Sequence, residues 1–224
     1  MAHVERTNFR GDPNLGFYAV STDEFCIVGK GLMSKNIKKI EEILKVEVAK
    51  ATVSGSELIG LFSAANKNGI VLPKIVEDKE IDFFKKMGLN VYVAKLKQTA
   101  MGNLILVNDK GCIISKDLKG IKKEIEDCFG VPVEVGAIAG LSVVGSAGYV
   151  TNLGLLVHRD CEEDEMKLLE DVLKVEGDIG TVSFGSPFVG ASIVANSNGF
   201  LVSEQTSGPE LQRVDEALGF VKVR

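Results

Sequence analysis

A histidine, an aspartate and a cysteine lie within four residues of one another in the segment "HRDC" at 158–161. These residue types perform nucleophilic catalysis when a base lowers the pKa of the thiol and a carboxylate orients that base. Here Cys161 follows His158 by only three residues, at a predicted junction between a strand and a helix. We therefore interpret the triplet as incidental and predict no catalytic residues.

Other chemistry-bearing motifs are lacking. The sequence has no phosphate-binding loop, no dinucleotide fingerprint and no Cys or His spacing typical of a metal site, so we expect no cofactor and no metal. A net charge of −5 argues against broad binding of free nucleic acid, which needs many basic residues. No signal-peptide core or bilayer-length apolar run is present, which predicts a cytoplasmic protein with no membrane partner. The cysteines are expected to be reduced thiols: Cys26, Cys112, Cys128 and Cys161.

The elements that would position functional residues are indicated by a repeated stretch. "ANKNGIVLP" at 65–73 returns as "VNDKGCIIS" at 107–115 and "ANSNGFLVS" at 195–203, with a weaker copy, "VTNLGLLVH", at 150–158. Each copy has a polar turn, then Gly, then apolar residues, which is typical of a hairpin. A second glycine precedes each of these four hairpins. A fifth, more divergent copy begins at Gly16, near the N-terminus, so there are five such glycines: Gly16, Gly60, Gly102, Gly145 and Gly190.

These glycines are separated by 44, 42, 43 and 45 residues, which indicates internal repeats. We predict a single domain, 1–224, made of five repeats. The approximate boundaries are 9–55, 56–98, 99–141, 142–186 and 187–224, with the N-terminal segment 4–9 closing a ring of these repeats.

Each unit has the same pattern: two strands, an amphipathic helix and a third strand. The expected helices cover 36–44, 79–87, 118–129, 164–173 and 210–218. A unit of about 44 residues cannot bury enough apolar surface alone, so neighbouring units must share a core. Two other classes of repeat protein have a similar period. Trp-Asp propellers carry Trp-Asp signatures and have no helix in each unit, whereas this sequence has no Trp and one predicted helix per unit. HEAT arrays are entirely helical, whereas this sequence has predicted strands.

An open solenoid and a closed ring both fit such repeats. The terminal units lack clear capping features, and the last unit stops at "FVKVR", part-way through its third strand. The N-terminal "VERTNF" precedes residues that match the end of a third strand, so we expect the two termini to pair. The predicted fold class is α/β (α+β), a closed five-fold α-β propeller of strand-strand-helix-strand repeats around a pseudo-five-fold axis.

The recurring glycines then have a structural role, because the absence of Cβ lets backbones approach closely where inner strands converge on the axis. The residues that follow them should form a circle at one end of the axis: Phe17, Leu61, Asn103, Ser146 and Ala191. Glycines that only form turns are the alternative.

Four stretches resemble the archaeal and eukaryotic translation initiation factor 6 family, the ribosome anti-association factors with the pentein fold. They are "IGLFSAANKNGIVLPKIVEDKEI" (59–81), "TAMGNLILVNDKGCIISKDL" (99–118), "VVGSAGYVTNLGLLVH" (143–158) and "QTSGPELQRVDEALG" (205–219). The resemblance extends from about residue 9 to the C-terminus.

The resemblance implies a non-enzymatic protein. The expected activity is to bind the intersubunit face of the large (50S) ribosomal subunit and block the small (30S) subunit, in translation initiation and large-subunit maturation. The implied anchor is an L14-type ribosomal protein near the sarcin-ricin loop. Release is expected to need an elongation-factor-like GTPase with a Shwachman-Bodian-Diamond-type protein. The factor itself is expected to be a monomer.

Ribosome-binding candidates follow from the circle and the resemblance. Asn103 is the first, because it is the polar member of a mostly apolar circle and matches a Gly-Asn motif of the family; Leu61 and Ser146 are its neighbours. A structural amide bonded to backbone is the alternative for Asn103. Three more candidates resemble a late "TTSTEL"-like segment of the family and could equally cap a helix: Thr206, Ser207 and Glu210.

Other polar groups have simpler interpretations. The turn residues Asn66, Asn108 and Asn196 are expected to serve their own turns. The run "DCEEDE" at 160–165 is expected to open a helix, with contact to a basic ribosomal protein as the alternative.

Two other functions stay open from the sequence. Pentein relatives include guanidino-modifying hydrolases built on Cys and His, but their cysteine lies late in the chain, and here no Cys follows 161. The other possibility is a scaffold disc with an unknown protein partner.

Overall fold

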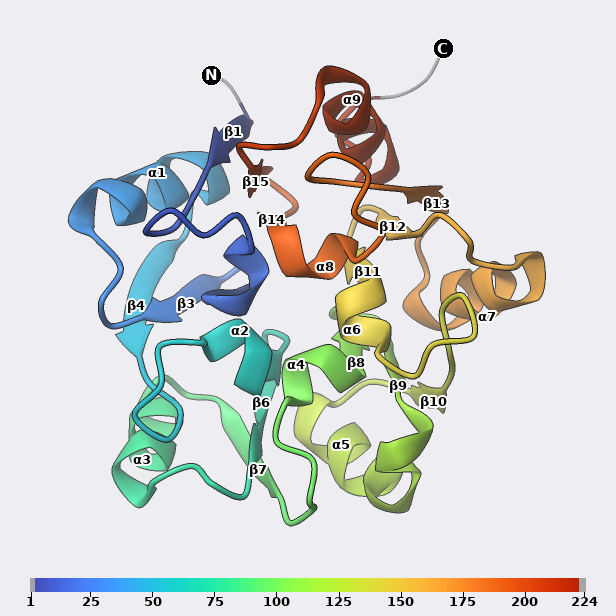
Figure 1. Cartoon of the computed structure of the whole chain (residues 1–224). Helices are drawn as coiled ribbons and strands as arrows, with labels where there is room; N and C mark the ends of the chain where they lie inside the picture. The colour runs from blue at the N-terminus through green and yellow to red at the C-terminus, as the bar shows by residue number, and fades with distance from the viewer. Residues whose placement is uncertain (1–2, 222–224) are drawn as a thin grey trace.

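The computed structural model describes residues 3–221. It is a mixed α/β structure with five small three-stranded sheets, and Figure 1 shows them arranged around a common centre, each flanked on the outside by a longer helix. Within every sheet the central strand is antiparallel to one neighbour and parallel to the other. The sheet orders are β2-β3-β4, β5-β6-β7, β10-β9-β8, β11-β12-β13 and β1-β15-β14.

The central strands agree with the predicted apolar runs, whereas the first strands begin later than expected, because short helical turns occupy the residues around each repeated glycine. The first strand of each sheet is β2 (Ala19–Ser21), β5 (Ala64–Ala65), β8 (Ile105–Val107), β11 (Gly148–Val150) or β14 (Ile193–Asn196). The central, most buried strands are β3 (Phe25–Gly29), β6 (Gly69–Pro73), β9 (Cys112–Ile114), β12 (Leu155–His158) and β15 (Gly199–Ser203). The third strands are β4 (Glu47–Ala51), β7 (Asn90–Ala94), β10 (Val133–Val135), β13 (Gly177–Gly180) and β1 (Val4–Thr7).

The five longer helices lie where the amphipathic period predicts them. They are α1 (Ser34–Leu44), α3 (Asp78–Lys86), α5 (Lys122–Phe129), α7 (Glu163–Leu173) and α9 (Gly208–Ala217), with a 3₁₀ segment, η2 (Lys116–Ile121), before α5. Three of them, α3, α7 and α9, begin with a capping box in which a Glu at the third helical position accepts from the cap backbone. The acidic run at 160–165 opens α7, as expected.

Five short helices lie outside the predicted pattern, and they change the place of the repeated glycines. Gly16, Gly60, Gly102, Gly145 and Gly190 lie in single helical turns instead of at the start of the first strands. A four-residue helix has no amphipathic period, so no sequence pattern marks it. These turns are η1 (Leu15–Phe17), α2 (Ile59–Phe62), α4 (Met101–Leu104), α6 (Val144–Ala147) and α8 (Val189–Ser192).

The two ends of the chain meet in the last sheet. β1 pairs in parallel with β15 over Val4↔Phe200 to Thr7↔Ser203, so the N-terminal segment supplies the third strand of that sheet. The segment "FVKVR" is expected from the sequence to begin the third strand of the last unit, and for its described residues this is wrong. Phe220 and Val221 are not in a strand, and β1 already occupies the position of the third strand. Phe220 instead contacts the rings of His3 and Phe200. The final residues, 222–224, lie outside the described part of the chain.

The core consists of five buried clusters, and each combines side chains from two successive units. One cluster, for example, joins Ile27 and Ala51 to Phe84. Another joins Phe9 and Ile40 near the N-terminus to Val194 and Leu201 near the C-terminus. The first and last units therefore share a core in the same way as other neighbours do. Over residues 3–221, none of the helices has the length and apolar character needed to cross a bilayer.

Candidate functional site

The short helices bring the five repeated glycines into contact around the centre (Figure 1). A Cβ added to any of them would lie 1.8–2.1 Å from the carbonyl oxygen of the preceding glycine in the series, and Gly16 meets Gly190 in the same way. No side chain fits at such distances, because the obstacle is backbone. Only glycine therefore permits this approach, which involves helical turns and not the strands expected from the sequence.

At this end of the centre the structure places a small cavity of about 20 Å³. Its lining includes the glycines together with Phe17, Asn103, Ser146 and Ala191. Leu61 is half-buried and does not line it. Four of the five residues expected to form a circle thus lie together.

The Asn103 side chain is partly exposed at this cavity. Its backbone N–H donates to the Ala100 carbonyl at 3.1 Å. No hydrogen bond of the side-chain amide is found within residues 3–221. An amide that needs no internal partner is available to an external one.

The turn asparagines behave differently. Asn108 Oδ1 accepts from the N–H groups of Lys110 and Gly111, at 2.9 and 3.0 Å, which closes its own turn. Its Nδ2 donates to the carbonyls of Thr151 and Leu173, 3.1 and 3.0 Å away in the next unit.

Asn66 and Asn196 make the same two kinds of bond. All three asparagines serve their turns as expected, and they also join neighbouring units, which no local sequence pattern indicates. The Leu173 carbonyl is the last of α7, so the Asn108 amide satisfies one of the acceptors that a helix end leaves free.

Two of the three late candidates, Thr206 and Glu210, hold one loop in place, and the third, Ser207, caps α9. Glu210 accepts from the N–H of Ser207 at 2.8 Å, from the N–H of Gly185 at 2.8 Å and from Thr181 Oγ1 at 2.9 Å. Thr206 is buried, and its Oγ1 accepts from the N–H of Ser183 at 3.3 Å. These side chains are thus satisfied internally, by a helix cap and by the loop at 182–186.

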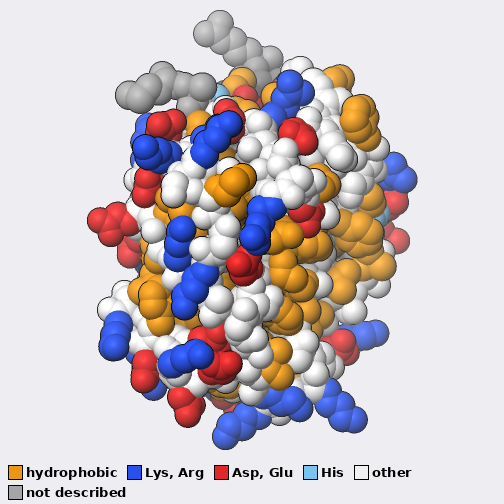
Figure 2. Space-filling model, turned by 60° about the vertical axis from the view of Figure 1, so that its left-hand side comes forward, with side chains coloured by type: hydrophobic (Ala, Val, Ile, Leu, Met, Phe, Trp, Pro, Cys, Tyr) orange, Lys and Arg blue, Asp and Glu red, His pale blue; other side chains and the backbone are white. Residues whose placement is uncertain are grey.

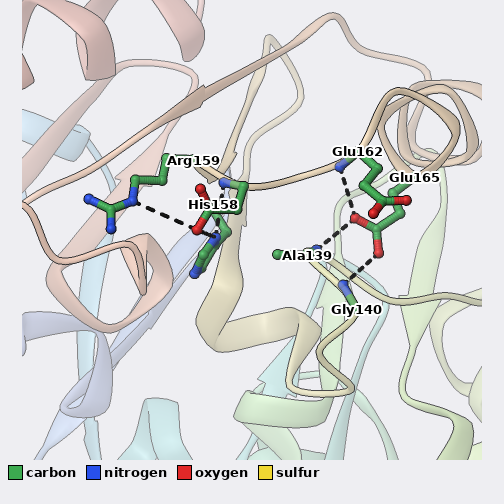
Figure 3. Close-up of polar contacts among 7 residues, drawn as sticks. Ala139, Gly140, His158, Arg159, Glu162 and Glu165 are labelled. Carbon is green, nitrogen blue, oxygen red and sulfur yellow. Dashed lines mark hydrogen bonds and ion pairs between the residues drawn. The ribbon is translucent and has the colours of Figure 1, made fainter.

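Glu80 and Glu165 occupy the same position in α3 and α7. Glu165 accepts from the N–H groups of Ala139 and Gly140 at 2.7 and 2.8 Å, and Figure 3 shows its carboxylate directed at this turn. Glu80 accepts from Ser54 and Gly55 in the same manner. Neither residue is among the candidates from the sequence, although the spacing of a capping polar residue and Glu three positions later occurs in all three helices.

Burial by itself raises the pKa of the Glu80 carboxyl, but hydrogen bonds from Thr52 and from three backbone N–H groups outweigh it. The pKa of Glu80 therefore lies below its ordinary value. The pKa values of Glu165 and Glu210 are lowered by the same balance of burial and hydrogen bonding.

The His158 segment does not form a catalytic arrangement. His158 is buried, and its Nδ1 accepts from the backbone N–H of Asp160 at 3.1 Å (Figure 3). In the neutral ring the proton then lies on Nε2, so neither nitrogen offers a free lone pair to a nucleophile. Burial, with a smaller effect of the Glu165 carboxylate, raises the pKa of the Cys161 thiol to about 11. At neutral pH this thiol is protonated and a poor nucleophile. Residues 3–221 contain no group of three or more His, Cys, Asp or Glu side chains able to hold a metal ion.

Charge is distributed unevenly around the molecule. Residues 142–186 carry nine acidic and three basic side chains, a net charge of −6. Residues 9–98 carry fourteen basic and eleven acidic side chains, a net charge of +3. Figure 2, which views the side carrying α1 and α3, shows Lys and Arg interspersed with Asp, Glu and hydrophobic side chains. The fourth unit therefore presents the acidic edge of the molecule.

Comparison with known proteins gives a consistent family assignment. The family model described as the eIF-6 family matches residues 4–217. The chain is 43% identical to "Translation initiation factor 6" of Pyrococcus abyssi over 226 residues, which covers 98% of this chain and 100% of the relative. It is 43% identical to the protein of the same name from Methanocaldococcus jannaschii, over 99% of this chain and 100% of the relative. The corresponding Saccharolobus islandicus protein is 41% identical, over 97% and 99%.

Proposed function

Because the chain belongs to the eIF-6 family, we propose that it binds the large ribosomal subunit on its intersubunit face and sterically prevents the small subunit from joining. Its role in translation initiation follows from membership of a family of translation initiation factors, and the chain is not an enzyme. The observation that carries the proposal is similarity along almost the whole chain, from residue 4 to residue 217 in the family model.

The fold that we propose is a closed five-fold α-β propeller of the pentein type, a single monomeric domain with five repeats at the predicted boundaries. Two observations support this proposal. The glycine contacts run through all five short helices and return from Gly190 to Gly16. The strand β1 and the core cluster of Phe9, Val194 and Leu201 join the chain ends. The five sheets are separate, so closure rests on helix contacts and shared cores, not on one continuous sheet.

A blocking factor of this kind needs a rigid surface and no reaction. Stable protein interfaces bury about 1,200–2,000 Å² in total. A body whose neighbouring units share cores loses little conformational entropy on docking, so more of the contact energy remains as affinity. Competition with the small subunit then follows from overlap alone.

We place the docking surface at the end of the axis where Asn103 lies, with Ser146 and Leu61 beside it. The support is that the Asn103 amide is partly exposed and has no bonded partner within residues 3–221. Thr206 and Glu210 contribute indirectly, because their hydrogen bonds hold the loop at 182–186, and Ser207 bonds to the Glu210 carboxylate. In this proposal the partner is chiefly an L14-type ribosomal protein near the sarcin-ricin loop.

We infer where the protein acts, and how it is released, from its family. The factor acts in the cytoplasm during initiation and large-subunit maturation. It leaves the subunit when an elongation-factor-like GTPase acts with a Shwachman-Bodian-Diamond-type protein.

Co-sedimentation tests the function directly. Purified archaeal large subunits are mixed with the protein, and joining is then started by adding small subunits. We expect the protein to sediment with large subunits and to lower the fraction of joined ribosomes. If it binds neither subunit, the proposal is wrong and a scaffold role with another partner replaces it.

Two asparagine variants test the docking surface. Asn103→Ser is expected to weaken large-subunit binding about tenfold with a nearly unchanged Tm, since it removes a side chain without an internal bond. Asn108→Ser is the matched control. It should lower Tm, because it leaves buried carbonyls of Thr151 and Leu173 without their donor. A large loss of Tm in Asn103→Ser would make Asn103 a structural residue instead.

A further inference from the structure

One turn of the repeat is longer than its equivalents, and the extra residue is a phenylalanine. Three units have a two-residue turn closed by a backbone bridge, with both central residues at positive φ: Arg10–Gly11, Ser54–Gly55 and Ala139–Gly140. The fourth such turn, bridged by Val182 and Ser186, contains Ser183, Phe184 and Gly185. The other three turns show that this connection does not need a third residue.

The Phe184 side chain contributes little burial of apolar surface to the fold. Its exposed fraction is 80%, the highest among the large hydrophobic residues exposed within 3–221. Its φ is 58°, in the left-handed region that a bulky side chain avoids. Arg10, Ser54 and Ala139 share this left-handed φ in the equivalent turns, so the conformation belongs to the turn. What sets Phe184 apart is a large apolar side chain left exposed there, and this points to a role outside the fold.

The backbone on both sides of Phe184 is held firmly. The N–H of Ser183 donates to Thr206 Oγ1 at 3.3 Å, and the N–H of Gly185 donates to Glu210 at 2.8 Å. Ser183 Oγ also lies 3.3 Å from Ser192 Oγ, in α8. The ring is therefore presented to solvent from a fixed turn, so burying it against a partner requires little further ordering.

The surroundings of the turn indicate what kind of partner fits. Two further exposed hydrophobic residues lie within five positions of Phe184 in the chain: Phe188, 40% exposed, and Ile179, 42% exposed. Phe188 packs edge-on against His158, and Asp160 with an exposed carboxylate follows in the next loop.

The strand β13, which carries Ile179 and Asp178, lies between α7 and α9. Residues 142–186 carry nine acidic and three basic side chains, and one of the acidic ones, Asp178, is paired with Arg213. Such a field repels the phosphates of RNA and attracts Lys and Arg, so it favours a basic protein surface.

We infer that Phe184 is an anchor residue that inserts into an apolar pocket flanked by Lys and Arg side chains on a basic protein of the large subunit. This inference rests on the proposed function and adds the fourth unit to its docking surface. Aromatic side chains held at the centre of an interface typically dominate its binding energy.

The variant Phe184→Gly separates binding from folding. Glycine accepts φ of 58° without strain, so Tm should be unchanged or higher, while affinity for purified large subunits should fall about 30-fold. Phe184→Tyr should keep affinity within a few-fold. Met33→Ala, which removes another exposed hydrophobic side chain at the start of α1, is the matched control and should bind like the unaltered protein.

Photo-cross-linking identifies what covers the ring. A photoreactive phenylalanine analogue, p-benzoylphenylalanine, is placed at position 184 and the complex with large subunits is irradiated. Cross-links to a ribosomal protein support the inference, and cross-links to rRNA or to a second copy of the chain overturn it. Unchanged affinity of Phe184→Gly also overturns it. If the unaltered protein fails to bind large subunits at all, the proposed function itself is wrong.

Discussion

Replacing Gly102 with alanine tests the central contact of the fold. A Cβ at this position would lie 1.8 Å from the carbonyl oxygen of Gly60 and 2.9 Å from that of Ser63. Real Cβ contacts stay beyond 3.0 Å, so the two helical turns would have to separate by about 1.2 Å. Both obstacles are backbone atoms, which cannot rotate away as a side chain would.

The size of the effect follows from two opposing contributions. Overpacking of a well-packed interior costs about 1–3 kcal/mol, and more where backbone must move. Alanine is favoured over glycine in a helix by about 1 kcal/mol, which offsets part of this cost. Because both obstacles, the carbonyl oxygens of Gly60 and Ser63, belong to backbone that must move, we place the overpacking cost above that range, at about 4 kcal/mol, and expect a net loss of about 3 kcal/mol. For a protein of this size such a loss lowers Tm by about 6–12 °C.

Thermal unfolding followed by circular dichroism measures the change. Gly120→Ala and Gly208→Ala are matched controls, since an added Cβ at either position has nothing within 4 Å. Both controls should remain within about 2 °C of the unaltered protein. If Gly102→Ala also stays in that range, close approach at the centre does not require glycine, and the steric reasoning is refuted.

Two further predictions concern titration and thiol chemistry. Glu80, Glu165 and Glu210 have folded-state pKa values below their ordinary value, so their stabilisation is complete above about pH 4.3 and is lost as the pH falls through the folded-state pKa. Urea unfolding at pH 7 and at pH 3.5 should show this loss, and Glu80→Gln should reduce it; an unchanged pH dependence in Glu80→Gln would contradict the assignment. Cys161, whose pKa is raised to about 11 by burial, should react with a thiol reagent at pH 7 at least tenfold more slowly in the native protein than after unfolding. Equal rates would show that the thiol is not protected.

The repeat could be predicted from the sequence because it combines local signals that recur. The strand Gly69–Pro73 has the bounds of the apolar run "GIVLP", and α1 begins two residues before the predicted range. These elements have a clear period and are bounded by turn residues. The short helices have neither feature, so the sequence pattern assigns the glycines to strands although their close contacts are made by helical turns.

The site was less accessible to sequence reasoning, because its contacts join residues far apart in the chain. Glu80 bonds to residues 26 and 25 positions away, and Asn108 bonds to Leu173 at a distance of 65 positions. The residue type at one position does not show which distant residue it will contact in the folded chain. Phe184 could not be recognised from the sequence for another reason: a phenylalanine in an apolar segment is typical of a core, and only its exposure in the structure distinguishes it.

Because the molecule consists of five similar units, a partner must distinguish between five similar rotations of it about its central axis. If the proposed ring docks with the end of its axis, the repeats alone would offer five similar ways of docking, and only one blocks the small subunit correctly. The symmetry is broken at the surface by the acidic fourth unit, by the amide of Asn103, which no other member of the circle carries, and by Phe184 in a lengthened turn. A partner with complementary charge and one apolar pocket therefore accepts a single rotation of the ring. Adding Ala139→Phe, in the turn of the preceding unit, to the variant Phe184→Gly should consequently fail to restore affinity. Restored affinity would show that the partner recognises an exposed aromatic residue without selecting its place on the ring.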